Sequence, residues 1–334
     1  MPIGSAAQFI PLNMSPPAEG FASDECYLAF DTVAPLRKLI DRKYWWPYPQ
    51  QGFTPVDTGV LVRAPDDWII PPPNPPHLPN RGSAALLPSG LAQEWQYTVR
   101  ESGSDIITLH EGLRAVYDLE GDGLTGANGF SAHGGSGMTA IGGTIRKNEL
   151  LESFGPIQHA LAITMNTGKW ATKKGGNITN GYRWPAIASD NYWNNAGTGN
   201  TNDVNNFGYG TWDNGDYSKD GLGMGTLLAL PQSFNITAQN FETTAGRKIA
   251  EALRSYGAYV VDSVYPTWDD MLINMDETCY QDAPEMHLGE QPVANSPYRR
   301  DMNKIVVALG LNDNNSPTTI GGGGTPLKPL APSF

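Results

Sequence analysis

The stretch SAHGGSGMTAIGGTIRKNELLESFGPIQHALAITM (131–165), followed by NGYRWPAIASDNYW (180–193), holds the chain's densest mixture of glycine turns, polar groups and aromatic rings. Glycines come in close pairs at 134–135 and 142–143, where a Cβ would block a tight turn or a close backbone approach. If IGGTIRKNEL and PIQHALAIT are strands, their side chains alternate between two faces. The stretch therefore predicts short strands joined by turns.

The remaining composition predicts the same mainly β class. The 334 residues include 38 glycines and 27 prolines. Only 17% are charged, below the ~25% usual in soluble domains. Short apolar runs separated by turn residues indicate further strands, as in 59–70, 83–102, 223–234 and 258–264. We expect a two-sheet β-sandwich or jelly roll.

Two segments with helical periodicity are expected at the periphery of this fold. The segment 244–256 follows a threonine cap and stops at Gly257. The segment 297–309 follows Ser296, has proline in its first turn and stops at Gly310. A third, short helix is predicted at 34–43. The prediction is one domain over 26–310, with extended arms at 1–25 and 311–334.

Charge and hydropathy limit the partners of the chain. The net charge of −12 argues against nucleic acid, because phosphate binding needs a basic face. Between 146 and 183, however, there are six basic and two acidic residues, so this segment carries a local positive charge. An anionic polysaccharide therefore stays possible as a partner. No apolar run approaches the ~20 residues of a membrane span. Cys26 and Cys279 could form one disulfide or remain two buried thiols, with the thiols favoured.

Residues 1–13, MPIGSAAQFIPLN, do not have the pattern of a signal peptide, because they lack a basic start and a long apolar run. Three routes stay open: a leader removed before this chain begins, export by another route, or no export. We expect an extracellular or cell-surface protein.

The central stretch also supplies the residue types of a carbohydrate site. An acidic sugar needs a cation or amide against its carboxylate, a histidine or tyrosine that moves protons, and a flat aromatic ring. One alternative is open for His159, whose alternation with Leu161 and Ile163 also fits a core histidine. The predicted catalytic residues are Arg146, His159, Tyr182 and Tyr192, and the predicted substrate-binding residues are His133, Gln158, Lys169, Arg183, Trp184 and Asp190.

An acidic segment suggests one metal. Asp118, Glu120 and Asp122, followed by Gly123, are spaced like the start of a calcium loop, in which alternate carboxylates converge on one ion. The twelfth position of such a loop is Gly129, so the bidentate glutamate is missing. A Ca²⁺ site and a plain acidic glycine turn both fit this segment, and no other cofactor is suggested.

Parts of the central stretch resemble known groups of proteins in two ways. The run GGSGMTAIGGTIRKNEL with IQHAL, YRWPA, MGTLLALP and YGAYVVD resembles a pattern in large, mostly uncharacterised bacterial proteins, many of them apparently secreted. It implies no function.

The second resemblance is to alginate-lyase-type jelly-roll polysaccharide lyases, whose R-x-E-L and Q-x-H motifs are similar to 146–150 and Gln158-His159. It implies that Arg146 and Gln158 neutralise a uronate, that His159 is the base and that a tyrosine is the acid. Gln158 and His159 are adjacent here, whereas the family separates them by one residue.

We therefore expect an extracellular, carbohydrate-directed protein that binds an acidic or neutral polysaccharide, or as a lyase cleaves an acidic one by β-elimination. The alternative is a structural subunit of a surface filament or virion-like assembly. In that case the terminal arms would make the contacts of a homo-oligomer.

Overall fold

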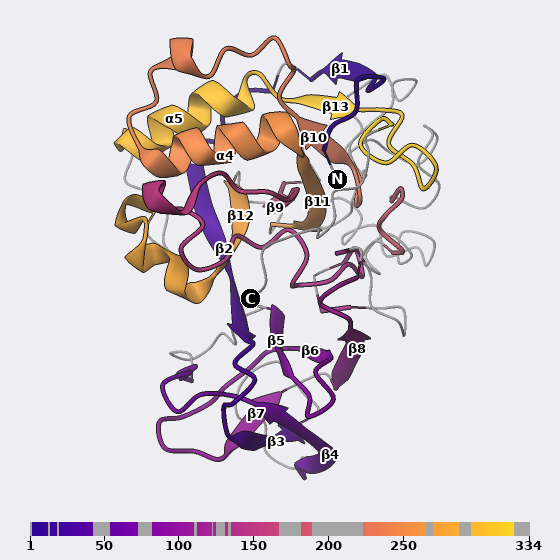
Figure 1. Cartoon of the computed structure of the whole chain (residues 1–334), viewed down its shortest axis with the longest axis vertical. Helices are drawn as coiled ribbons and strands as arrows, with labels where there is room; N and C mark the ends of the chain where they lie inside the picture. The colour runs from indigo at the N-terminus through magenta and orange to yellow at the C-terminus, as the bar shows by residue number, and fades with distance from the viewer. Residues whose placement is uncertain are drawn as a thin grey trace, which may run out of the picture. The chain divides into compact units, whose positions relative to one another are not determined.

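The computed structural model describes residues 2–12, 14–18, 20–42, 54–72, 82–109, 112–121, 123–124, 131–132, 135–166, 182–188, 223–264, 270–286 and 295–323 (Figure 1). These residues are mainly β, as predicted, whereas the sandwich arrangement stays a prediction. They pack as two compact units, where the sequence predicts one domain over 26–310. The first unit holds the described residues up to 24, 135–136 and those from 142 on; the second holds 25–132 and 137–141.

The first unit is built on a mixed sheet with strand order β1-β13-β10-β11-β9-β12-β2. β9 is parallel to β11, whereas β1 with β13, β13 with β10, β10 with β11 and β12 with β9 are antiparallel. Every residue of β9, β10 and β13 is buried, including the polar Thr164 of β9 and Asn312 of β13. The strands are β1 (Phe9–Pro11), β2 (Gly20–Ala29), β9 (Leu161–Met165), β10 (Leu227–Ala229), β11 (Ala258–Ser263), β12 (Asp270–Asp276) and β13 (Gly310–Asn312).

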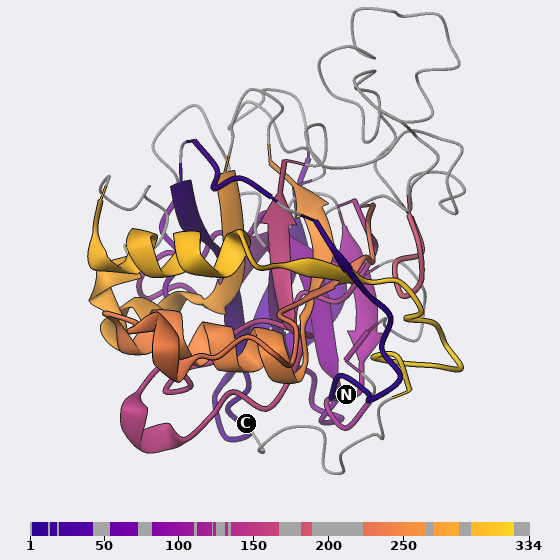
Figure 2. The ribbon, with the colours of Figure 1, turned by 90° about the horizontal axis from the view of Figure 1, so that it is seen from above.

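Two α-helices, α4 (Thr244–Ser255) and α5 (Pro297–Val306), lie side by side over one face of this sheet (Figures 1 and 2). Both predicted starts are confirmed. The Thr243 side chain accepts a hydrogen bond from the N–H of Gly246 at the start of α4. At the start of α5, the Ser296 side chain accepts one from the N–H of Arg299, and Pro297 is the first residue of the helix. Each helix buries one apolar face, which includes Ile249 in α4 and Ile305 in α5. Short 3₁₀ turns lie at Glu152–Phe154, Thr237–Gln239, Glu277–Gln281 and Pro284–Met286.

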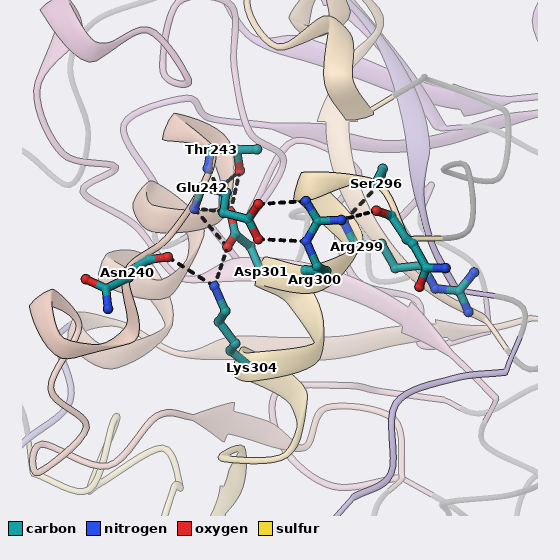
Figure 3. A network of polar contacts seen from close by, with 10 residues as sticks. Asn240, Glu242, Thr243, Ser296, Arg299, Arg300, Asp301 and Lys304 are labelled. Atoms are coloured by element: carbon teal, nitrogen blue, oxygen red, sulfur yellow. Dashed lines mark hydrogen bonds and ion pairs between the residues drawn. The ribbon is translucent and has the colours of Figure 1, made fainter.

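A buried carboxylate joins the two helices. Asp301 of α5 is fully buried and accepts hydrogen bonds from the N–H groups of Glu242 and Thr243 and from the Thr243 hydroxyl, at 2.8–3.0 Å. Figure 3 shows Asp301 pointing at the start of α4, with Lys304 3.0 Å from it and Arg300 in a two-pronged contact with Glu242. One side chain of α5 thus caps the helix beside it.

The second unit has the strand order β2-β5-β4-β3-β7, with β6 on β5 and β8 on β6. β2 crosses the boundary, because residues 20–24 belong to the first unit and 25–29 to the second. The core packs Trp68 edge-on against Trp95, with ring centroids 6.5 Å apart. The further strands are β3 (Leu36–Asp41), β4 (Val56–Arg63), β5 (Gly82–Leu86), β6 (Ala92–Gln96), β7 (Ile106–Leu109) and β8 (Leu113–Tyr117).

The short helix predicted at 34–43 is wrong, because Leu36–Asp41 forms β3 between β4 and β7. The residues that this strand buries are Arg37, Leu39 and Asp41, at every second position. Burial with period 2 belongs to a strand. The charged residues between the apolar ones had concealed it.

Apart from Glu25, the described parts of both predicted arms belong to the first unit. Residues 9–11 pair with 310–312 in the sheet, and β2 begins at Gly20. Among the described residues, no helix combines the length and the apolarity needed to cross a bilayer.

Candidate functional site

The structure brings Arg146 and His159 together through a third residue, Glu149. Arg146 Nη2 lies 2.6 Å from one carboxylate oxygen of Glu149, and His159 Nε2 lies 2.9 Å from the other. The backbone N–H of Arg146 also donates to that second oxygen, at 2.8 Å. The Glu149 side chain is 3% exposed, against 13% for Arg146 and 15% for His159. These three residues form a nearly closed ion cluster, the Glu149 cluster.

The environment of Glu149 keeps it ionised. Burial by itself raises the pKa of this carboxyl, but the charge and hydrogen bond of His159, together with Arg146, outweigh burial and lower the pKa to about 2. His159 Nδ1 lies 2.8 Å from the carbonyl oxygen of Ala160. Both ring nitrogens therefore face acceptors, and both hydrogen bonds form only when both nitrogens carry protons.

Two neighbours close the cluster further. Lys248 of α4 is buried and donates to the carbonyl of Leu151 at 2.5 Å, and burial lowers its pKa. Cys279, which follows β12, is buried with its Sγ 3.4 Å from the carbonyl of Ile145. Burial raises the pKa of this thiol well above its ordinary range, so it stays neutral and unreactive.

Tyr182, Arg183 and Trp184 form a second group, the 182–184 group. Tyr182 bridges to Met224, and the N–H of Arg183 donates to the Met224 carbonyl at 2.8 Å. Gly225 has a φ of +79°, and a Cβ on it would collide with the Arg183 carbonyl. The Trp184-Pro185 bond is cis. All three side chains keep part of their surface exposed.

The strand register separates the 182–184 group from the Glu149 cluster. His159 precedes β9, at the end where the N–H of Leu161 donates to Gly257 just before β11. Gly225 donates to Val260, further along β11, and Tyr182 lies beside the adjacent Met224. Three strand spacings of ~4.8 Å thus separate the two sets sideways, roughly 14 Å. An acid and a base acting on one bond must both reach it, and this register puts His159 and Tyr182 three strand spacings apart.

Polar backbone from the glycine-rich stretch lies beside the 182–184 group. The N–H groups of Ile187 and Ala188 both donate to the carbonyl of Ser136, at 3.1 and 3.2 Å. The preceding Gly135 donates to Asp262 at the carboxyl end of β11, at 3.3 Å. Three distant pieces of sequence therefore converge at this end of the sheet.

Several predicted residues remain to be placed. Gln158 is exposed beside His159, whereas His133, Lys169, Asp190 and Tyr192 lie outside the described residues. Of the proposed calcium ligands, Asp118 accepts a hydrogen bond from the N–H of Glu120 at 3.0 Å, and Asp122 also lies outside. No group of three or more histidine, cysteine or acidic side chains suited to a metal occurs in the part of the chain that the structure describes. Cys26 and Cys279 are buried free thiols.

Sequence reasoning missed Glu94 of β6, a fully buried carboxylate in the second unit. It accepts hydrogen bonds from the hydroxyl of Thr139 and from the N–H groups of Ala132 and Ala140, the latter two at 3.0 and 3.1 Å. Burial raises its pKa to about 7, although these hydrogen bonds act in the other direction. The alternation of Trp95 and Tyr97 predicts one buried face for this strand, but both faces are buried.

Comparisons with protein-family models, with curated proteins and with solved structures find no match to this chain. The two resemblances noted in the sequence stay predictions. The functional assignment therefore depends on the chemistry of the described residues.

Proposed function

We propose that this protein is carbohydrate-directed and binds an acidic polysaccharide through Tyr182, Arg183 and Trp184. The observation that carries the proposal is their combination of a fixed backbone with partly exposed side chains. Aromatic rings pack against the apolar faces of sugars, and a guanidinium pairs with a carboxylate through two parallel N–H groups. The three consecutive residues offer both kinds of group.

The present partner of Arg183 supports an anionic ligand. Arg183 Nη2 donates to the backbone carbonyl of Asp313 at 2.7 Å and lies 3.2 Å from that residue's carboxylate. The two side chains are 15% and 22% exposed, so solvent reaches the pair. A uronate carboxylate has the same chemistry as the Asp313 side chain. It could replace that side chain while the backbone carbonyl still orients the guanidinium.

Binding without cleavage fits the geometry better than β-elimination. A catalytic base needs a free lone pair, and both ring nitrogens of His159 are engaged with acceptors. Tyr182, the tyrosine that would act as the acid, lies several strands away from His159 in the sheet. We therefore assign the Glu149 cluster to stability and the 182–184 group to the ligand.

Binding to a polyuronate such as alginate, compared with neutral dextran, tests the proposal by titration calorimetry. We expect Arg183→Ala to weaken polyuronate binding at least ~10-fold, which corresponds to the loss of about 1.4 kcal/mol. Arg254→Ala is the matched control, since Arg254 also donates to one backbone carbonyl, that of Phe234. Trp184→Ala should weaken binding similarly, with folding checked by circular dichroism.

Two results would overturn the proposal: wild-type protein that binds no polyuronate, or an Arg183→Ala variant that binds as tightly as the control. Cleavage is read in the same samples from the ultraviolet absorbance of an unsaturated uronate. We expect none. Its appearance, abolished by His159→Ala, would restore the lyase function and reject the assignment of the Glu149 cluster to stability.

A structural role in a filament or virion-like assembly remains the second proposal. It requires terminal segments that reach another subunit. Residues 2–12 instead contact residues 309–323 of their own chain. The same contacts nevertheless suggest how two copies could be joined.

A further inference from the structure

Residues 2–12, the 2–12 segment, lie against Ser255 and residues 309–314 and 321–322 of the same chain, a surface here called the groove, and backbone hydrogen bonds hold them there. The N–H of Ile3 donates to Ser255 at the end of α4, and that of Gly4 donates to Gly321, both at 2.7 Å. Further along, the N–H of Asp313 donates to Gln8 at 2.9 Å. Figures 1 and 2 show this segment running beside β13. The groove therefore receives the segment as it would receive an added strand.

Small residues shape the groove. A Cβ on Gly310 would collide with the Phe9 ring, and one on Gly322 would collide with Ala7. The Phe9 ring is the largest side chain seated there, over the first residue of β13. The side chain of Asn314 adds two specific contacts, since it accepts from the N–H of Gln8 at 2.9 Å and donates to the carbonyl of Ala6 at 3.0 Å. The groove is thus complementary to this particular segment.

The position of the segment makes it easy to detach. β1 has three residues and lies at the edge of the sheet, so that among the described strands it pairs with β13 alone. Pro11 has no N–H to contribute to that pairing. Edge strands open with a smaller free energy than the sheet interior. Detachment would leave the donors and acceptors of β13 and 313–321 exposed and ready to pair again.

Residues 13–19 connect the 2–12 segment to β2. They include Pro16-Pro17, which favours an extended chain. Arg299 of α5 anchors the end of this connection, donating to the carbonyl of Ala18 at 2.8 Å. The connection can thus keep its anchor while the residues before it are redirected.

We propose that the 2–12 segment is an exchangeable strand, and that the segment of one copy occupies the groove of a second copy of this chain. Every contact of the 2–12 segment described above is then remade between chains. What opposes exchange is the effective concentration of a chain's own segment, on the order of millimolar for a short connection. Exchange therefore increases with protein concentration and on any surface that gathers the copies. This inference is independent of glycan binding.

Photo-crosslinking of the full chain tests the exchange. Phe9 is replaced by p-benzoylphenylalanine, an aromatic residue that keeps the ring in the groove, and unlabelled protein is mixed with ¹⁵N-labelled protein. We expect crosslinked peptides that join one light and one heavy chain, in which position 9 of one chain is attached to residues 309–323 of the other. Their yield should rise with protein concentration up to ~1 mM. The same replacement at Phe154, which is 46% exposed, is the matched control for random collision.

Crosslinks from position 9 that always join two light or two heavy peptides would overturn the proposal. So would mixed crosslinks no more frequent than those from position 154. A chain that lacks residues 1–12 gives a second measurement. It should bind a synthetic peptide of residues 1–12 and lose that binding when Phe9 of the peptide is replaced by Asp. If this shortened chain does not fold, the crosslinking result decides alone.

Discussion

Glu149 and Glu94 are both buried glutamates, one in each unit, yet their pKa values shift in opposite directions from 4.5, to about 2 and about 7. Burial raises both. Glu149 faces the Arg146 guanidinium and the His159 ring, whereas among the described residues the partners of Glu94 are a hydroxyl and backbone N–H groups. Full charges outweigh the loss of hydration, and dipoles offset only part of it. The charge of the partners, more than the depth of burial, decides which glutamate is ionised.

Removing the Glu149 carboxylate should have the largest effect. Glu149→Ala leaves the nearly buried Arg146 guanidinium, and His159 beside it, without their carboxylate partner, which costs roughly 3–5 kcal/mol of unfolding free energy. Urea denaturation followed by circular dichroism measures it. Glu152→Ala is the matched control, because Glu152 also pairs with an arginine, Arg247, but is 71% exposed, and it should lose less than ~1 kcal/mol. Equal losses in the two variants would mean that the Glu149 cluster contributes no more than a surface pair.

The acid limb of stability should depend on Glu149. A carboxyl whose pKa is lowered in the folded state stabilises the protein fully above pH 4.5, its ordinary pKa. That stability is lost as the pH falls through about 2, its pKa in the folded protein. The difference amounts to roughly 3 kcal/mol. Unfolding free energies of wild type and Glu149→Gln, measured from pH 6 downward, should therefore converge. Parallel curves would contradict the low pKa.

Glu94 should make the unfolding free energy depend on pH in the opposite direction, by about the same amount. Its folded-state pKa lies above the ordinary value, so the associated stability is full below 4.5 and is lost as the pH rises through about 7. Wild type should lose roughly 3 kcal/mol across this range relative to Glu94→Gln, whose side chain does not titrate. The same denaturation series, continued to alkaline pH, measures it. A wild-type curve that runs parallel to that of Glu94→Gln would show that the neutral donors suffice to ionise Glu94.

The smallest expected effect concerns the hydroxyl that Glu94 contacts. Thr139→Val keeps the shape but removes a donor that lowers the pKa of Glu94, so the midpoint of the neutral-to-alkaline limb should move upward. The loss of stability should be about 1.5–3 kcal/mol above that midpoint, where the carboxylate is charged. Thr144→Val, at another buried threonine, is the control and should leave the midpoint in place.

How much of the site could be predicted depends on how local its determinants are. Arg146 and His159 were both singled out from the sequence, and the structure brings them together through Glu149, which lies three and ten residues from them in the chain. The expectation that Tyr182 completes one site with them stays a prediction, and the structure places β11 and the 224–225 segment between them. Glu94 was missed because alternation cannot tell a strand with one buried face from a strand with two.

The sequence by itself determined the mainly β class, the starts of α4 and α5 and the apolar strands, because caps, turns and periodicity act between residues close along the chain. Only the tertiary structure decided that 36–41 is a strand, that the 2–12 segment closes on β13, and that two buried glutamates differ in charge. Each of these depends on groups tens to hundreds of residues away, such as Asp313 for Gln8 and Thr139 for Glu94. Burial and charge are properties of the environment that these distant groups create, and local patterns carry no record of it.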